Sequence, residues 1–232
     1  MDLIQALAAE LGKDPRHVEN VVHLLDEGNT IPFIARYRKE LHGAMDDTSL
    51  RTLEERLQYL RGLEERREAV KKSIDEQGKL TDELAAAIDS AKTLAEVEDL
   101  YRPYKQKRRT RATIAKEKGL EPLAALLFAQ ERDCPRPEEA ARDFVDPEKG
   151  VETVEDALQG ASDIIAEQIS DDAAIRKSLR ALISRQGQLV SRAATEDDSV
   201  YRLYYDFTQS VARLQGHQVL AINRGEKEGI LK

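Results

Sequence analysis

The feature that most constrains the fold is a stripe of apolar residues between positions 50 and 74. Its members recur at steps of three, four and seven residues, which places them on one face of an α-helix. Charged residues of alternating sign fill the positions between them, as on a solvated helix face. The pattern therefore predicts one long helix with a narrow buried side. The stripe consists of Leu50, Leu53, Leu57, Leu60, Leu63, Val70 and Ile74.

The residues around this helix carry signals for its ends and for helices that return along it. Asp46 precedes the first turn as an N-cap, and Gly78 follows the last turn, where glycine is favoured. Thr81 is the expected cap of a second helix, and Thr93 forms a capping box with Glu96 before a third. We therefore expect residues 46–104 to form a long helical hairpin.

Composition supports a helical fold for the whole chain. Charged residues make up 34% of the sequence and aromatic residues 5%, and tryptophan is absent. Sandwiches and barrels need more β-branched and aromatic residues than this. We expect an all-α, or nearly all-α, fold. The net charge of −8 repels nucleic acid and anionic membranes, so binding to either requires a local basic patch.

The first 45 residues contain signals for three short helices joined by tight turns. Gly12 and Gly28 end the first two helices, and Asp14 caps the second with Pro15 in its first turn. Thr30 is the expected cap of a third helix that runs to about Leu41. Residues 1–45 therefore resemble a helix-turn-helix-like three-helix unit.

The rest of the chain divides into two stretches. Residues 105–190 contain a basic segment followed by a helical bundle, in which helices capped by Thr153 and by Ser170 or Asp171 are expected to pack as an antiparallel pair. Residues 191–232 give weaker signals and are interpreted as a linker to a further domain. Residues 217–232 fit either a helix or an alternating strand. The chain stops as an apolar element begins, so we expect it to be part of a longer protein.

Catalytic and cofactor sites are not expected. The single cysteine, Cys134, excludes an internal disulfide, and the four histidines lack the spacing of metal ligands. Neither a P-loop nor a dinucleotide-binding glycine pattern is present. The first residues do not form a secretory signal, and no apolar stretch is long enough to span a bilayer. We expect a non-enzymatic, cytoplasmic protein without metal or cofactor.

A basic segment at residues 102–111 is the main candidate for nucleic-acid binding. It holds six cations and no acid, and such a patch binds phosphates without regard to base sequence. Two tyrosines, Tyr101 and Tyr104, are interleaved and are candidates for stacking on bases. The alternative is that carboxylates of the helical hairpin, within residues 81–100, pair with these cations. The candidate phosphate contacts are Arg102, Lys105, Lys107, Arg108, Arg109 and Arg111.

A second, smaller group of cations belongs to the three-helix unit. On a helical wheel, Ile34, Tyr37 and Leu41 share one face, whereas Arg36 and Lys39 lie on the far side and are free to meet phosphate. Arg38 lies at the edge of the apolar face, where a guanidinium without a partner is costly. We therefore expect Arg38 to form a structural ion pair. The outward face of this third helix has too few polar residues to recognise a specific base sequence.

Four stretches of this sequence resemble the N-terminal region of the Tex family of transcription accessory proteins. The Tex architecture itself resembles the core of a eukaryotic transcription elongation factor. The resemblance covers essentially the whole chain. The matching stretches are EGNTIPFIARYRKELHGAMDDTSLR, LYRPYKQKRRTRATIAKEKGLEPLA, ALQGASDIIAE and HQVLAINRGEKEGILK.

The resemblance implies a helical region with a helix-turn-helix-like unit. In the family, a domain with an RNase H-like fold, helix-hairpin-helix repeats and an OB-fold RNA-binding domain follow this region. It also implies a non-catalytic protein, with weak contacts to RNA or DNA from this region. The alternative is a scaffold that docks RNA polymerase or another transcription factor, while the later domains bind nucleic acid. No small-molecule substrate or membrane partner is expected.

Overall fold

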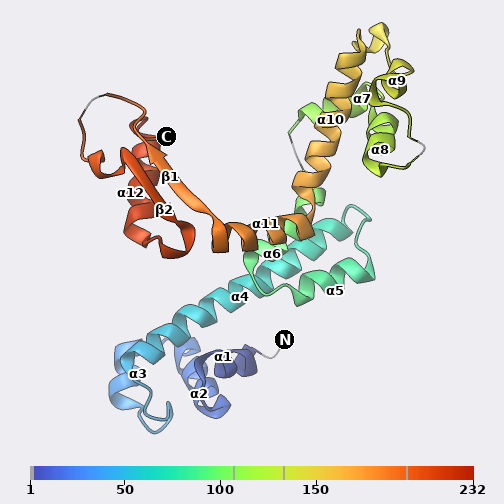
Figure 1. The fold of residues 1–232 in the computed structure, drawn as a ribbon. Coiled ribbons are helices and arrows are strands. Elements are labelled where there is room, and N and C mark those ends of the chain that lie inside the picture. The colour runs from blue at the N-terminus through green and yellow to red at the C-terminus, as the bar shows by residue number, and fades with distance from the viewer. Residues whose placement is uncertain (1–2, 107, 133, 197) are drawn as a thin grey trace. The chain divides into compact units, whose positions relative to one another are not determined.

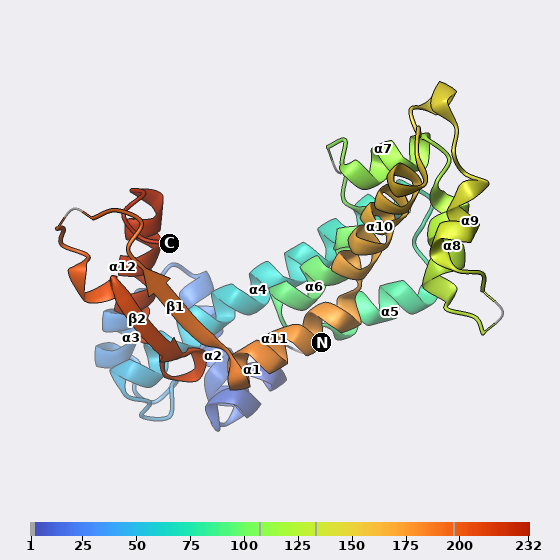
Figure 2. The same ribbon diagram turned by 45° about the horizontal axis from the view of Figure 1, so that its top comes forward.

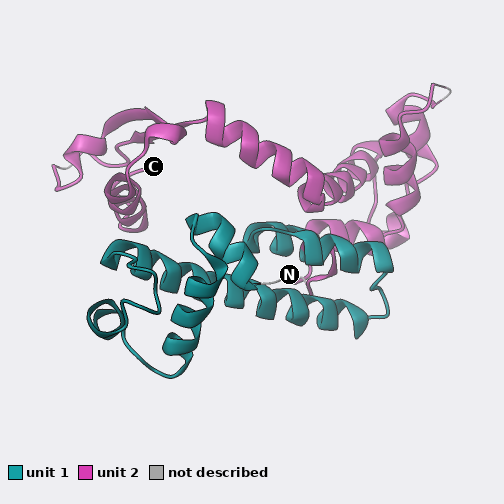
Figure 3. Ribbon diagram, turned by 90° about the horizontal axis from the view of Figure 1, so that it is seen from below, with its two compact units in different colours: residues 1–101 teal, residues 102–232 magenta. Residues whose placement is uncertain are grey.

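The computed structural model describes residues 3–106, 108–132, 134–196 and 198–232. These residues form twelve α-helices, several short 3-10 turns and one two-stranded antiparallel sheet (Figure 1). This confirms the predicted, predominantly helical fold class. The chain divides into two compact units, Met1–Tyr101 and Arg102–Lys232, here called unit 1 and unit 2 (Figure 3). None of the described helices is both long and apolar enough to cross a bilayer.

Unit 1 is built on the long helix predicted from the apolar stripe. All seven stripe residues are buried along helix α4. One end of α4 packs against the three N-terminal helices, and the other packs against α5 and α6. The six helices are α1 (Leu3–Leu11), α2 (Pro15–Asp26), α3 (Ile31–Tyr37), α4 (Asp47–Asp75), α5 (Asp82–Ser90) and α6 (Leu94–Tyr101).

Helix α3 is shorter than the sequence predicted. It ends at Tyr37, and Arg38 has left the helical conformation with φ −130° and ψ 35°. Leu41 is therefore not on the same helix face as Ile34. Tyr37 is on the same helix as Ile34, three residues on, but its side chain is 57% exposed, so the apolar face is not buried as far as Tyr37. The helical wheel failed because it assumed one more helical turn than the chain makes.

Two carboxylates of the N-terminal helices pair with arginines of α4. Glu10 accepts hydrogen bonds from Arg56, and Asp26 accepts them from Arg61, each with a shortest distance of 2.7 Å. These hydrogen bonds lower the pKa of Glu10 and of Asp26 below their ordinary values of 4.5 and 3.8. Both carboxylates are therefore stabilised as anions in the folded state.

These two pairs make the stability of unit 1 depend on pH. Because the folded pKa values are depressed, the stabilisation is present above the unfolded values of 4.5 and 3.8 and is lost as the pH falls below them. We expect the Glu10→Gln/Asp26→Asn double variant to lose less stability than the parent chain between pH 6 and pH 3, measured by denaturant unfolding. Glu19→Gln, at an exposed carboxylate, is the control. Equal pH profiles for the parent and the double variant would contradict this account.

The first part of unit 2 is a helical bundle around α10. Helices α7, α8 and α9 pack against α10 and enclose a small apolar core (Figures 1 and 2). Thr153 caps α10 through a complete capping box with Asp156. The helices are α7 (Arg111–Glu117), α8 (Glu121–Ala129), α9 (Pro137–Arg142) and α10 (Val154–Asp171), with the 3-10 turns η1 (Arg102–Tyr104) and η2 (Pro147–Lys149).

Helix α11 (Ala173–Gln186) differs from its prediction. It was expected to pack along α10 as an antiparallel pair, but no residue of α11 is buried. Asp172 alone separates the two helices, and it serves as both the C-cap of α10 and the N-cap of α11. One residue is shorter than the usual connection between antiparallel helices.

The last part of unit 2 combines a hairpin with a helix. Strand β1 (Gln188–Arg192) pairs antiparallel with β2 (Asp206–Ser210), with Val190 opposite Thr208. The turns η3 (Arg202–Tyr204) and η4 (Val211–Arg213) flank β2. Residues 217–232, left open between helix and strand, contain helix α12 (Gly216–Lys227). A small core joins these elements through Tyr201, Ile222 and Leu231. The predicted role of residues 191–232 as a linker stays a prediction.

Candidate nucleic-acid interface

The basic segment lies at the start of unit 2, between η1 and α7. Pro103 is part of η1, where its fixed φ suits the tight turn. Thr110 then caps α7 by accepting a hydrogen bond from the backbone N–H of Thr113 at 3.1 Å. The cations between these two points are carried by irregular backbone. Lys107, one of the predicted contacts, lies outside the described residues.

Three of the predicted phosphate contacts form ion pairs with carboxylates of unit 2. Arg102 pairs with Asp171 at 3.0 Å, and Arg109 pairs with Glu117 at 2.6 Å. Arg111 reaches Asp163 only at 3.7 Å, and its side chain stays 84% exposed. These partners belong to α7 and α10 and not to the helical hairpin that the sequence alternative suggested. The positive charge of the segment is therefore partly neutralised within the fold.

The other two described cations have no such partner. Lys105 and Arg108 are exposed, and no carboxylate of the described residues lies within ion-pair distance of either. Their charges face solvent and remain accessible to an outside anion. Among the candidates of the basic segment, these two have the geometry that phosphate binding requires.

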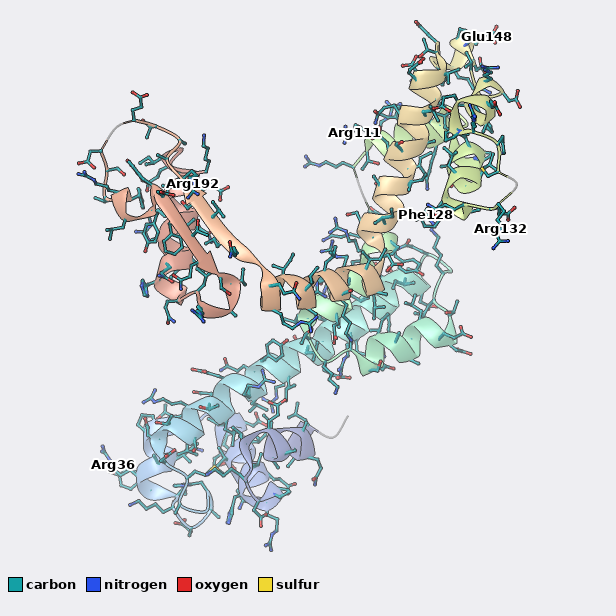
Figure 4. The ribbon with its side chains drawn as sticks, viewed as in Figure 1. Arg36, Arg111, Phe128, Arg132, Glu148 and Arg192 are labelled. Carbon is teal, nitrogen blue, oxygen red and sulfur yellow. The ribbon has the colours of Figure 1, made fainter. Side chains whose placement is uncertain are left out.

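The surface next to the basic segment is hollow and mixed in charge. A groove of about 880 Å³ lies between η1, α7, α8 and α10. Lys105 and Lys116 line it, and Phe128 and Ile164 supply apolar surface; Figure 4 labels Phe128 on α8. Acidic side chains also line the groove, so it does not attract phosphate uniformly. These acids are Glu121, Glu167, Asp171 and Asp172.

The two tyrosines occupy different environments. The Tyr101 hydroxyl is 3.0 Å from the Ser73 hydroxyl, and the Arg66 guanidinium lies over its ring at 5.4 Å. These contacts with α4 account for the half-buried position of Tyr101 without nucleic acid. Tyr104 is also half-buried, within η1. Stacking of bases on either ring stays a prediction.

The cations of the three-helix unit are placed as follows. Arg36 and Lys39 are exposed and unpaired among the described residues, and Figure 4 shows Arg36 at the surface of α3. Arg38 is half-buried; its guanidinium lies 5.4 Å from the centre of the Phe33 ring and donates to the Tyr37 carbonyl at 3.4 Å. In the part of the chain that the structure describes, no carboxylate pairs with Arg38. A ring face and a carbonyl thus take the place of the expected ion pair.

The sequence predicted helix α11, but its exposed basic and apolar surface was overlooked. It carries four cations and no acid, together with four apolar side chains that are 38–53% exposed. The signal was visible as a basic, amphipathic 14-residue stretch, but the expected pairing with α10 concealed it. The exposed apolar side chains are Ile175, Leu179, Leu182 and Ile183.

No group of three or more potential metal ligands is found among residues 3–106, 108–132, 134–196 and 198–232. The described surface offers exposed cations and a groove of mixed charge.

Comparison with known proteins agrees with the sequence resemblance. Residues 1–75 match the family model described as the Tex-like protein N-terminal domain, and residues 133–232 match the Tex central region-like model. The two ranges follow one another in the order that their descriptions imply. This chain belongs to the Tex family. The basic segment, residues 102–111, lies between the two matched ranges.

Relatives from bacteria and animals align along almost the whole chain. Transcriptional accessory protein Tex of Neisseria gonorrhoeae is 44% identical over 100% of this chain and 30% of its own length. Protein YhgF of Escherichia coli is 48% identical over 97% of this chain and 29% of its own length. Human S1 RNA-binding domain-containing protein 1 is 31% identical over 99% of this chain and 24% of its own length. The chain thus spans less than a third of the length of each of these relatives.

Proposed function

We propose that this chain is a non-catalytic, helical part of a transcription accessory protein and that it contributes weak, sequence-independent contacts to nucleic acid. The observation that carries the proposal is the exposure of Lys105 and Arg108 without ion-pair partners among the described residues. The names of the relatives, which refer to transcription and to an RNA-binding domain, support the same class of function.

The mechanism is release of counterions from the phosphate backbone. Each cation that meets a phosphate frees condensed salt ions, so affinity comes from entropy and falls as salt is added. Arg111 joins Lys105 and Arg108 readily, because its contact with Asp163 is long and exposed and exposed pairs contribute little stability. Arg102 and Arg109 contribute less, since a phosphate must compete with their carboxylates. Binding is therefore weak.

The three-helix unit is proposed to add contacts to the backbone and not to bases. Arg36 and Lys39 supply positive charge near the end of α3, whereas Glu40 beside them repels phosphate. A recognition helix needs several polar side chains that reach base edges. Helix α3 has seven residues and ends at Tyr37, just before Lys39.

A titration of single-stranded RNA and DNA at low salt tests this function. We expect Lys105→Ala/Arg108→Ala to weaken binding about tenfold or more, because two phosphate contacts of roughly 1 kcal/mol each are lost. Lys79→Ala is the matched control, since Lys79 is exposed and unpaired among the described residues but lies in the α4–α5 turn. It is expected to leave the affinity nearly unchanged. Equal affinities for the double variant and the parent chain would refute the assignment.

A second function, docking of a protein partner, is favoured by helix α11. Four exposed apolar side chains lie together on this helix. Single exposed apolar residues are common on protein surfaces, but a group of this size resembles the face that a helix presents to a partner. In this alternative, the chain is a scaffold for RNA polymerase or another transcription factor, and other parts of the longer protein bind nucleic acid. Negligible binding of RNA and DNA by the parent chain would favour this alternative.

A further inference from the structure

Strand β1 has a second edge, away from β2. Ala193 donates to the Tyr205 carbonyl at 3.0 Å, and Gly187 accepts from the Val211 N–H at 2.9 Å, so the odd-numbered residues of this stretch bond toward β2. In an antiparallel ladder, alternate residues direct their backbone groups to opposite edges. The backbone groups of Gln188, Val190 and Arg192 therefore point to the other side of β1.

The end of the chain already occupies part of that second edge. Arg192 and Lys232 exchange two backbone hydrogen bonds of 2.9 Å, and Ala194 donates to the Ile230 carbonyl at 2.8 Å. Ala193 and Leu231 form an antiparallel bridge between these bonds. Residues 230–232 thus begin a third strand beside β1. Because this strand is antiparallel, residues after Lys232 would run toward Gln188.

We propose that the edge of β1 from Gln188 to Ser191 binds the segment that follows Lys232 in longer Tex proteins. This segment completes a three-stranded antiparallel sheet with β1 in the middle. The matched family regions are N-terminal and central, and the chain spans less than a third of its relatives, so much of their length follows the match. The unpaired backbone groups on the open part of this edge are a ready template for another strand, which favours its addition.

The register of the existing bonds fixes which residues meet. The first residue after Lys232 lies opposite Ser191, the second opposite Val190 and the third opposite Leu189. Leu189 belongs to the face that packs on α12, whereas Val190 is on the other face and is 50% exposed. Side chains alternate between the two faces of a strand. The first and third added residues are therefore expected to be apolar and to extend the core around Ile222 and Leu231.

Amide hydrogen exchange tests this pairing. The parent chain is compared with a version extended past Lys232 by the ten or so residues that follow the matched region in the E. coli relative. We expect the Val190 amide to exchange about tenfold or more slowly in the extended chain. The Ser191 amide, which faces β2, is the internal control and should be protected in both chains.

Two outcomes would overturn the proposal. One is a Val190 amide that exchanges equally fast in both chains, which would show that the edge stays open. The other is protection of Val190 in the parent chain that disappears on dilution, because this would assign the edge to a second copy. A proline variant provides a separate readout. Val190→Pro removes only the outward N–H, so it should lower the melting temperature more in the extended chain than in the parent chain.

Discussion

Replacing Gly160 with valine is expected to lower the free energy of unfolding of unit 2 by about 3 kcal/mol. Gly160 is part of α10, where that helix crosses α7 and the start of α8. A Cβ atom at this position would lie 2.3 Å from Leu120 Cδ1 and 3.3 Å from Ala115 Cβ. Leu120 is almost completely buried, so it cannot move aside without disturbing the core. Denaturant unfolding followed by circular dichroism measures the loss.

Gly62→Val is the matched control for this substitution. Gly62 is also a glycine inside a long helix, α4, but a Cβ atom there would meet no other atom within 4 Å. The change in helix propensity is the same at both sites, so the difference between the two variants isolates packing. Gly62→Val is expected to change stability by less than about 0.5 kcal/mol. If both variants lower the free energy of unfolding equally, the close packing of Gly160 on Leu120 does not contribute the expected stability.

Removing the Glu64 carboxylate is expected to destabilise unit 1 by about 2–3 kcal/mol, although Glu64 lies at the surface. Its partner Arg67 is only 3% exposed and pairs with Glu64 at 2.6 Å. The same guanidinium donates to the Ala91 carbonyl at 2.5 Å, and its Nε has no partner among the described residues. Glu64→Ala would leave a buried charge without a counterion. Thermal and denaturant unfolding report the cost.

A second substitution separates this buried charge from simple loss of a surface residue. Arg67→Met removes the charge and keeps much of the side-chain volume, so Glu64→Ala/Arg67→Met should be no less stable than Arg67→Met alone. Glu68→Ala is the control on the same helix. Its partner Lys71 keeps a second contact, with Asp89 at 2.8 Å, so little change is expected. If the stability lost by Glu64→Ala/Arg67→Met equals the sum of the losses of the two single variants, the role assigned to Glu64 is contradicted.

The long helix and the overall fold class followed from the sequence because both depend on local periodicity. The stripe from Leu50 to Ile74 is a property of neighbouring residues, and each member is buried on α4. The caps at Asp46, Thr81 and Thr153 are equally local, and each accepts the expected backbone hydrogen bond. The stripe and these three caps were predicted correctly, whereas the predicted cap of α11, Ser170 or Asp171, was wrong, since Asp172 takes that place.

The end of α3 and the pairing of the basic segment depend on contacts that the sequence does not display. Arg102 meets Asp171 and Arg111 meets Asp163 because α7 and α10 pack together. These partners are more than fifty residues apart along the chain. The sequence also predicted that Arg38 needs a partner, but it did not reveal which one. The guanidinium contacts the Phe33 ring and the Tyr37 carbonyl and not a carboxylate of the described residues. Charge runs reveal candidate cations, and tertiary packing decides which of them remain available.

The salt dependence of single-stranded RNA binding tests the central claim, that Lys105 and Arg108 meet phosphates, most directly. Each phosphate contact adds about 0.7 to the slope of log affinity against log salt concentration. The parent chain should therefore show a slope about 1.4 steeper than Lys105→Ala/Arg108→Ala, and Lys79→Ala should match the parent chain. Identical slopes for the parent chain and the double variant would contradict the account.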